Sequence, residues 1–329
     1  MNSTIYDVSR LSGVSTATVS RVFSDPERVR EGTRRSVLEA AEVLHYHPNA
    51  IARAMAKQRT DKIAFLICKQ RATILDEFYA GICDGIMQET NKTDYQLLIS
   101  TADAWKTTAG TAQRKQIEGV ILGGNAQADM VLEFQNQHIA VVLVNSRIPG
   151  LDLPCVLSDE EGGVRQIVEH LWDRGHTRIA MLAGRLSPYI SSERYNAFLK
   201  AMRQKGIPVD SQSVKMCSPD VESATRAATE LLTGSRRPSA IFASNDVIAS
   251  GTLKAAARLK VKVPEELAVV GYDDSALCTM LEPEMTSVHT HRHRMGRLCV
   301  ERLTALLKGE ELTEPTTILP AELVIRGTT

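Results

Sequence analysis

The stretch from residue 4 to residue 24, TIYDVSRLSGVSTATVSRVFS, constrains the fold of this 329-residue chain more than any other. Thr4 and Asp7 are spaced as a capping pair at the start of a helix that Gly13 ends. Ser15 can cap a second helix, which buries two valines and turns small polar side chains outward. Two short helices joined by a tight turn with glycine are typical of the helix-turn-helix that enters the major groove of DNA.

A third amphipathic helix and a short Ala-rich segment follow this stretch. Val37, Leu38, Ala41 and Leu44 recur on one helical face and are expected to close a three-helix core. After residue 46 comes HPNAIARAMAKQRT, with proline at a helix start. Two helices around a glycine also occur in small helical domains without a DNA ligand, so this continuation favours the DNA-binding interpretation.

The quoted segments resemble a known family. YDVSRLSGVSTATVSRV, followed by TRRSVLEAAEVLHYHPNAIARAM, is similar to the DNA-binding headpiece and hinge of the lactose/galactose repressor (LacI/GalR) family of bacterial transcription regulators. RGHTRIAMLAG, SNDVIASG and VVGYDD extend the resemblance over essentially the whole chain. It implies a headpiece at residues 1–46, a hinge helix and linker at 47–60, and a core at 61–329, with lobe 1 at about 61–157 plus 290–318 and lobe 2 at about 158–287 plus 319–329.

From Lys62 onward, short apolar runs alternate with amphipathic segments. The first group of apolar runs is KIAFLIC, YQLLIS, GVILGG and IAVVLVN, and the second group is CVLSD, RIAMLAG, VKMC, AIFAS and LAVVGYDD. Helices are expected at 78–90, 160–174, 192–205, 221–233, 246–260 and 295–308. A last strand is expected before LVIRGTT. This alternation predicts parallel sheets covered on both faces, in two successive Rossmann-like lobes with a ligand between their strand ends. The expected fold is therefore a small all-α helix-turn-helix headpiece plus a two-lobed α/β core, which the resemblance relates to periplasmic sugar-binding proteins.

Composition agrees with a cytoplasmic DNA-binding protein. Residues 1–60 hold nine Lys and Arg against six Asp and Glu, whereas the remainder holds 30 against 33, so the basic excess lies where phosphates would be met. The sequence has neither a signal-peptide core nor an apolar run of the ~20 residues that a membrane span needs. Six cysteines without CxxC spacing are expected to be reduced packing residues.

The resemblance assigns DNA contacts to specific positions. The positions that face base edges are matched by Thr16, Ala17 and Arg21, and those that hold phosphates by Tyr6, Thr18, Ser20 and Asn49. The hinge contains Arg53 and Met55, and Met55 replaces a leucine that wedges into the minor groove. Arg21 is the expected base reader, because arginine fits the two acceptors of guanine. Arg30 stands where the family has Ser or Thr as a helix cap, and we expect it to contact a phosphate. His45 stands where Gly or Asn commonly ends that helix.

Within the core, the resemblance places an effector site. Arg194, Asn245 and Asp273 match effector-binding positions, and Phe78 or Tyr79 matches an aromatic position of the first lobe. An arginine donor and an aspartate acceptor suit the vicinal hydroxyls of a sugar, and an aromatic ring suits its apolar face. Two alternatives stay open: Asn245 can cap the helix that follows it, and Asp273 can belong to a turn.

HTHRH is the only metal-like motif. His289, His291 and His293 are expected to alternate on one side of a strand, where they could hold zinc or nickel, but interleaved arginines favour solvated crossover residues, and we predict no metal. The sequence holds no nucleophile elbow, phosphate loop or HExxH motif, so we expect neither catalysis nor a cofactor.

The predicted function is that of a homodimeric repressor of sugar-utilisation genes, which binds pseudo-palindromic operator DNA under the control of a small effector, a sugar or sugar phosphate. A purine- or nucleoside-responsive repressor is the first alternative; Pro188 and Ile190 weigh against it, while Pro219, in place of a stacking aromatic, weakens the sugar assignment. A solute-binding protein and a sugar-modifying enzyme with a DNA-binding module are the others. No membrane partner and no coiled-coil tetramer are expected.

Overall fold

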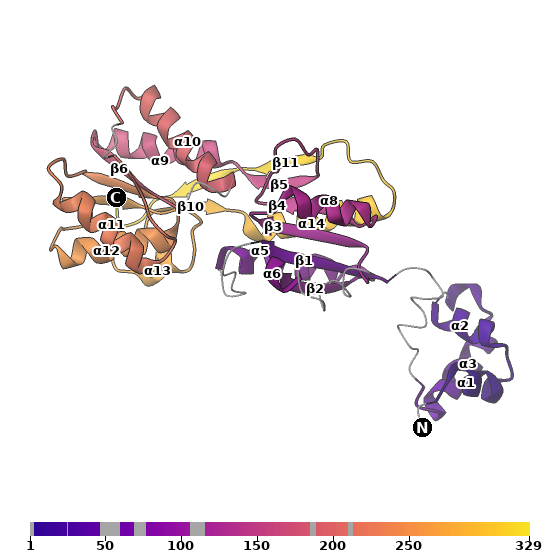
Figure 1. The fold of residues 1–329 in the computed structure, drawn as a ribbon. Helices are drawn as coiled ribbons and strands as arrows, with labels where there is room; N and C mark the ends of the chain where they lie inside the picture. Colours follow the sequence, from indigo (N-terminus) through magenta and orange to yellow (C-terminus); the bar gives the residue numbers. More distant parts are fainter. Residues whose placement is uncertain are drawn as a thin grey trace. The chain divides into compact units, whose positions relative to one another are not determined.

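The computed structural model describes residues 3–24, 26–46, 60–68, 77–105, 116–184, 189–209 and 213–329. The chain forms two compact units, Met1–Asp61 and Lys62–Thr329, and each is described on its own (Figure 1). The first is the expected helix-turn-helix headpiece, and the second is the expected α/β core with two parallel sheets.

Capping side chains and a glycine set the ends of the first headpiece helices. They are α1 (Ile5–Ser12), α2 (Thr16–Ser24) and α3 (Glu31–Val43), with a 3-10 turn η1 (Pro26–Arg28) before α3. The Asp7 carboxylate accepts hydrogen bonds from the backbone N–H and the hydroxyl of Thr4, at 2.9 and 2.7 Å. Gly13 ends α1 at φ 72°, in the left-handed region that glycine adopts without strain. Ser15 Oγ then accepts from the Thr18 N–H, which caps α2 as predicted.

A small apolar core closes the three helices. It contains Val8, Val19, Val22, Val37, Ala40 and Ala41. The expected inclusion of Leu38 was wrong: its side chain is 46% exposed, because the α3 face that meets α1 and α2 is centred on its alanines. Arg30 is the N-cap of α3 and makes no side-chain capping bond, and His45 follows the helix at φ 48°.

Lobe 1 of the core is built on a six-stranded parallel sheet. Its strands are β1 (Lys62–Cys68), β2 (Gln96–Thr101), β3 (Gly119–Gly124), β4 (Ala140–Val144), β5 (Cys155–Ser158) and β11 (Thr316–Leu319), in the order β11-β5-β4-β3-β1-β2. Helices α5 (Glu77–Thr90) and α14 (Arg292–Leu307) cover one face, and α6 (Ala102–Trp105) and α8 (Ala128–Asn136) cover the other. Both faces are apolar, as strands buried on two sides require.

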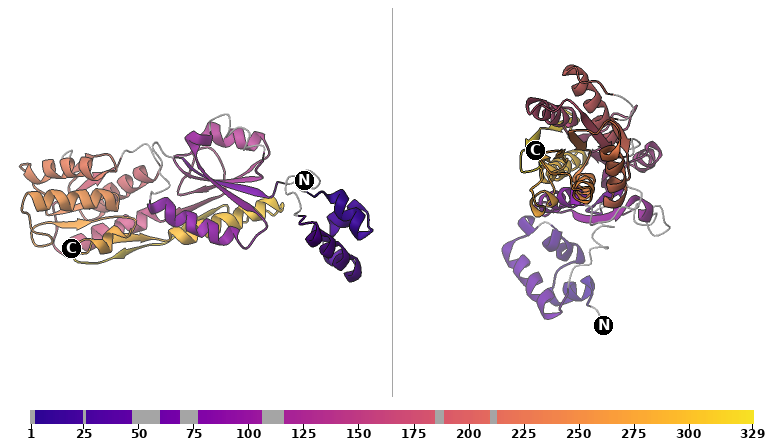
Figure 2. Two further views of the ribbon diagram at one scale, coloured as in Figure 1. Left: turned by 90° about the horizontal axis from the view of Figure 1, so that it is seen from below. Right: turned by 90° about the vertical axis from the view of Figure 1, so that its left-hand side faces the viewer.

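Two glycines let α5 and α14 cross at close range, side by side in Figure 2. A Cβ at Gly85 would lie 2.0 Å from the carbonyl oxygen of His293, and a Cβ at Gly296 would lie 2.1 Å from that of Ile82. No side chain fits at either position without separating the helices, so these glycines set the packing distance of one face of lobe 1.

Lobe 2 repeats the architecture with a four-stranded sheet. Its strands are β6 (Ile179–Ala183), β7 (Val214–Met216), β8 (Ala240–Ala243) and β9 (Ala268–Val270), in the order β7-β6-β8-β9. Helices α9 (Glu160–Asp173) and α10 (Tyr189–Gln204) pack on one face, and α11 (Val221–Thr233) and α12 (Asp246–Arg258) pack on the other. A short helix, α13 (Leu277–Met280), follows β9.

The final segment passes through both lobes, as the resemblance implied. Strand β10 (Ser287–Thr290) leaves lobe 2, α14 and β11 add to lobe 1, and β12 (Ala321–Val324) returns to pair antiparallel with β10. The Val269 N–H donates to the Thr328 carbonyl, which fixes the chain end to lobe 2. The single strand expected before LVIRGTT is thus two strands, and β12 includes the first two residues of that motif.

Candidate functional site

The exposed face of α2 carries the side chains predicted to meet bases. Ala17 and Arg21 are exposed and Thr16 is half-buried, while the buried Val19 and Val22 hold the opposite side of the helix. The small residues leave room beside the Arg21 guanidinium, so this face can approach a base edge closely. Such a surface is what a recognition helix requires.

The residues predicted to contact phosphates lie around this face. Tyr6 is 69% exposed on α1, Ser20 is half-buried, and Arg30 is exposed at the start of α3. The Thr18 hydroxyl lies 2.9 Å from Ser15 Oγ and is therefore part of the α2 cap as well. Three further predicted residues, Asn49, Arg53 and Met55, lie outside the described residues.

In lobe 2, the predicted effector residues Arg194 and Asp273 meet in a buried ionic cluster. Arg194 comes from α10 and is 5% exposed. Its Nε donates to Glu160 at 2.6 Å, its Nη1 donates to the Ser244 carbonyl at 2.6 Å, and its Nη2 donates to Asp273 at 2.9 Å. The guanidinium also stacks on Tyr272, with 3.7 Å between Cζ and the ring centroid. The cluster joins the carboxyl ends of β8 and β9 to the start of α9.

The charges of this cluster depend on one another. Burial alone disfavours the Arg194 cation, but the neighbouring carboxylates of Asp273 and Glu160 outweigh it and raise the pKa of the guanidinium. Burial raises the pKa of Glu160, and the Arg194 charge opposes that rise. Removing one partner would leave the other charges without compensation at a site with little access to water, so the stability of each charge depends on the whole cluster.

The loop after β9 is held in a conformation that few residues adopt. Asp273 has φ 101° and Asp274 has φ 49°, both in the region that favours glycine, although aspartate tolerates it better than most residues. Asp246 holds this loop in place, because its carboxylate accepts hydrogen bonds from the Ser275 N–H at 2.7 Å and from the Ser287 hydroxyl at 2.6 Å. Burial, followed by the Asp273 charge, raises the pKa of Asp246 to about 6.

The same loop contacts lobe 1. Glu77, at the start of α5, accepts a hydrogen bond from the Ala276 N–H, and Arg292, at the start of α14, donates to the Asp274 carbonyl at 2.9 Å. Because α5 follows β1 and the loop follows β9, the carboxyl ends of the two sheets meet here. Ligands of open α/β sheets bind at such strand ends, and these contacts connect that region of one lobe to the other.

The other predicted effector residues are placed differently. Asn245 caps α12 by accepting from the Ile248 N–H at 2.9 Å, which uses its Oδ1 and leaves the amide nitrogen as the group to offer a ligand. Tyr79 is 3% exposed and belongs to the apolar core of lobe 1, whereas Phe78 is half-buried against that core. Phe78 is therefore the better placed of the two rings to contact a solute.

Four residues of this region escaped the sequence prediction. Glu160, Tyr272 and Asp246 support the Arg194 cluster or its loop, and Asn145 ends β4 with a left-handed φ of 50°. Among the described residues, the buried Oδ1 of Asn145 is one of the polar atoms without a hydrogen-bond partner. A polar residue directly after an apolar strand was the available signal for Asn145. Nothing comparable marks Glu160, whose partner is 34 residues away.

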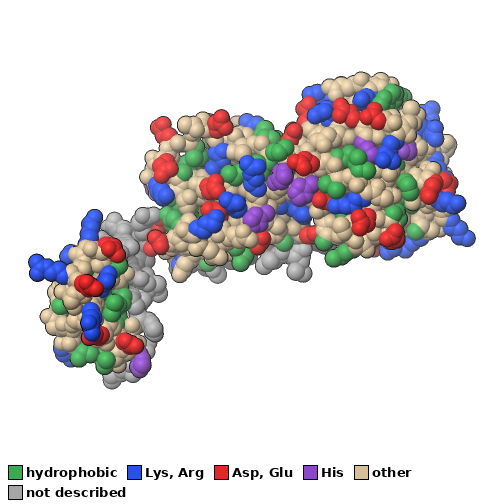
Figure 3. Space-filling view, turned by 180° about the vertical axis from the view of Figure 1, so that it is seen from behind, with side chains coloured by type: hydrophobic (Ala, Val, Ile, Leu, Met, Phe, Trp, Pro, Cys, Tyr) green, Lys and Arg blue, Asp and Glu red, His purple; other side chains and the backbone are tan. Residues whose placement is uncertain are grey.

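The three histidines do not share one side of a strand, so that prediction was wrong. Strand β10 ends at Thr290, His291 precedes α14, and His293 lies inside it. Each imidazole instead faces its own carboxylate: His289 meets Asp274 at 3.0 Å, His291 meets Glu322 at 3.7 Å, and His293 meets Asp84 at 3.3 Å. Figure 3 shows several histidine side chains close together on the surface, near the middle of the α/β core unit. Within the described residues, no group of three His, Cys, Asp or Glu is arranged to hold a metal ion.

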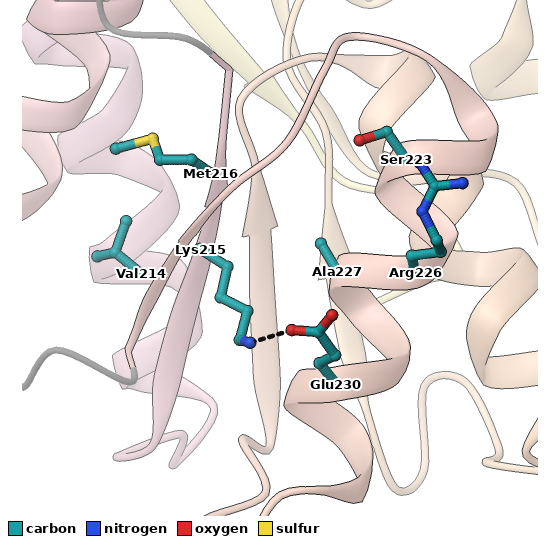
Figure 4. A pocket seen from close by; sticks show the side chains of 7 residues that line it. All are labelled: Val214, Lys215, Met216, Ser223, Arg226, Ala227 and Glu230. Atoms are coloured by element: carbon teal, nitrogen blue, oxygen red, sulfur yellow. Dashed lines mark hydrogen bonds and ion pairs between the residues drawn. The ribbon is translucent and has the colours of Figure 1, made fainter.

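A hollow of about 490 Å³ lies elsewhere in lobe 2, at its outer edge (Figure 4). It is lined by Val214, Lys215, Met216, Ser223, Arg226, Ala227 and Glu230. Lys215 already forms an ion pair with Glu230 across it, and Arg226 pairs with Glu222 on the same helix. The buried Arg194 cluster differs from this hollow, because it gathers oriented polar groups from α9, α10 and the segments after β8 and β9.

Comparison with known proteins finds matches for both the headpiece and the α/β core. Residues 4–49 match the bacterial regulatory proteins of the lacI family, and residues 168–329 match a periplasmic binding protein-like domain. The catabolite control protein A of Priestia megaterium is 31% identical over 335 residues, covering 100% of both chains. The chain belongs to the LacI family of bacterial regulatory proteins. It is a ligand-responsive DNA-binding transcription regulator and not an enzyme.

Two solved structures share the fold of this chain. The transcriptional regulator CelR in complex with cellobiose is 28% identical and superposes with a TM-score of 0.76, covering 99% of this chain and 100% of that one. A lac repressor dimer bound to operator and an anti-inducer superposes with a TM-score of 0.88, covering 100% and 99%; at 24% identity it shows the shared fold. Among the described helices of this chain, none has the length and apolarity to cross a bilayer.

Proposed function

We propose that this regulator is a homodimeric, cytoplasmic repressor whose headpieces bind the two halves of a pseudo-palindromic operator. The observation that carries the proposal is the open face of α2, where exposed Ala17 and Arg21 stand on a helix fixed by buried valines. A two-fold dimer presents two such helices, so its DNA site has matching symmetry. The lac repressor structure, a dimer on operator, supports this arrangement by analogy of fold.

The proposed effector is a sugar that binds beside Arg194, Asn245 and Asp273. The proposed targets of the repressor are genes for sugar use. A sugar is supported as the effector by the structure of the related regulator CelR, which is a complex with cellobiose. Binding at this edge changes DNA affinity only if the solute prefers one arrangement of the lobes. Contacts from the Asp273 loop to Glu77 and Arg292 connect the site to lobe 1, which the chain joins to the headpiece.

Selection from a pool of randomised duplexes with the full-length protein tests the DNA-binding part. We expect enrichment of one pseudo-palindromic sequence. Arg21→Ala should lose preference at one base position in each half-site, worth about 1 to 3 kcal/mol, and keep salt-sensitive general affinity. Arg35→Ala is the matched control, since Arg35 is exposed on α3 and pairs with Glu39. No enrichment, or unchanged preference in Arg21→Ala, would contradict the proposal.

Asp273→Ala tests the link between the two sites. The variant should bind the selected operator normally and no longer respond to a solute that changes the affinity of the unaltered protein. Operator titrations with and without that solute measure this. A fully responsive variant would remove Asp273 from the effector site.

A further inference from the structure

Strand β7 is the last strand on one side of the lobe 2 sheet. The Ser213 carbonyl and the Cys217 N–H form hydrogen bonds with β6, at 2.7 and 2.9 Å. Alternate residues of a strand direct their backbone groups to the same neighbour, so Val214 and Met216 direct theirs away from β6. Within the described residues, no strand pairs with this outer edge of β7.

An unpaired strand edge can recruit another strand, and proteins commonly protect such edges by a very short strand or by a lysine. The short β7 does carry Lys215, but the ammonium group is turned toward α11, where it forms an ion pair with Glu230 (Figure 4). Val214 and Met216 point to the opposite side of the strand (Figure 4). Lys215 therefore does not shield the outer edge of β7, and the Met216 side chain beside it is 49% exposed.

An apolar groove of about 550 Å³ follows the same edge on the α10 side. Its lining includes Tyr195 and Leu199 of α10, Val209 ahead of β7, and Met216. Tyr195, Leu199 and Val209 are only partly buried against the lobe 2 core. A strand added to β7 would remove apolar surface of this groove from water, which favours association.

The α11 side of the edge carries cations and anions in equal number. Lys215 pairs with Glu230, and Arg226 pairs with Glu222 at 2.7 Å. This balance favours neither a strongly acidic nor a strongly basic partner. A copy of the chain related by a two-fold axis would bring each ion pair beside its equivalent, where the charges can alternate in sign.

We propose that the outer edge of β7 is an interface between two copies of this chain, in which two β7 strands pair antiparallel about a two-fold axis at Lys215. Val214 exchanges two hydrogen bonds with the partner's Met216, and Met216 exchanges two with the partner's Val214. The two four-stranded sheets become one continuous sheet, with both α10 helices on one face and both α11 helices on the other. The two Glu230 carboxylates separate the charges of Lys215 and the partner's Lys215.

The consequence for regulation rests on the proposed homodimer. If the chain is a dimer, pairing of β7 strands joins two dimers into one assembly with four headpieces, which can hold two operators at once. No coiled coil is needed for this assembly. The pairing involves no residue of the headpiece and none of the Arg194 cluster.

Sedimentation velocity of the full-length protein, from about 1 to about 100 µM, measures this association. We expect a species that converts, as the concentration rises, into one of twice its mass. Met216→Pro removes the outward N–H, keeps the bonds of Ser213 and Cys217 to β6, and suits an edge strand, so it should weaken the association by at least about tenfold. Leu132→Lys is the matched control, because Leu132 is 47% exposed on α8 of lobe 1, and it should change nothing.

Charge variants test the interface without altering the backbone. Glu230→Lys places four cations around the two-fold axis and should also weaken the association by at least about tenfold. Lys215→Glu combined with Glu230→Lys exchanges the charges and should restore it; a failure to restore it contradicts the charge arrangement. Because the Glu230 side chain is exposed on α11, Glu230→Lys decides the question if Met216→Pro does not fold.

The proposal is overturned if the largest species has the same mass in the unaltered protein, Met216→Pro and Glu230→Lys, whether or not another molecule binds at this edge. It is also overturned if Leu132→Lys weakens the association as much as Met216→Pro does. Sedimentation is measured without DNA, so a failure of operator selection would be attributed to the proposed function alone.

Discussion

The two lobes of the core have the same alternation of strands and helices but bury different kinds of side chain. In lobe 1, two glycines bring α5 and α14 together, and ion pairs such as that of Glu89 with Arg297 lie at the rim. In lobe 2, the strand ends enclose Glu160, Arg194 and Asp246, the only charged side chains that are buried within the described residues. The packing of lobe 1 depends on the shape of its helices, whereas lobe 2 also buries charged side chains at its strand ends.

The largest expected effect comes from breaking the lobe 2 cluster. Arg194→Met leaves the buried Glu160 and the half-buried Asp273 without their partner, which should lower the free energy of unfolding by about 3 to 5 kcal/mol. Urea unfolding followed by tryptophan fluorescence measures it, because Trp105 reports on lobe 1 and Trp172 on lobe 2. Arg165→Met is the control, since the exposed pair of Arg165 with Glu169 should contribute about 1 kcal/mol or less. Equal losses in the two variants would mean that the cluster is not a buried ionic site.

A second test uses pH. The folded-state pKa of Asp246 is about 6, above the 3.8 of the free side chain, so the folded chain binds more protons between these values. Stability from this group therefore rises as pH falls from 7 toward 4, by up to about 3 kcal/mol for a shift of roughly two pKa units. Asp246→Asn should remove that rise. Urea midpoints at pH 7, 6 and 5 measure it, and a rise that persists in the variant would assign it to another group.

These differences explain what could be predicted from the sequence. Strands such as KIAFLIC and the paired helices of the headpiece were predictable, because apolar periodicity and capping residues act locally. The partners of Glu160 and Asp246 could not be predicted, since they come from segments 34 and 41 residues away that only the folded sheet brings together. Alternation in HTHRH suggested a strand, yet the contacts of α14 with α5 extend the helix back to Arg292.

A third test concerns the helix crossing of lobe 1. Gly296→Ala gains up to about 1 kcal/mol of helix propensity. Its Cβ would lie 2.1 Å from the Ile82 carbonyl oxygen and 2.8 Å from the Ile86 nitrogen, backbone atoms that cannot turn aside. We expect a net loss of about 1 to 3 kcal/mol, seen in the Trp105 signal of a Trp172→Phe background. Gly309→Ala offers a contrast, because that glycine has open space but φ 78°, so its cost is confined to backbone strain. Gly296→Ala as stable as the unaltered protein would show that the crossing is not set by this contact.

The smallest effect is expected at the rim of lobe 1, and its pH dependence has the opposite sign to that of Asp246. A hydrogen bond from Lys92, with a second from Arg297 of α14, lowers the pKa of Glu89. The stability that Glu89 contributes is present above the pKa of the unfolded chain and is lost as pH falls through the lower folded value. Glu89→Gln should cost less than about 1 kcal/mol at pH 7, and added salt should reduce the cost further. Urea unfolding at low and high salt measures both. A loss as large as that of Arg194→Met would show that lobe 1 also depends on a buried charge, and the distinction between the lobes would fail.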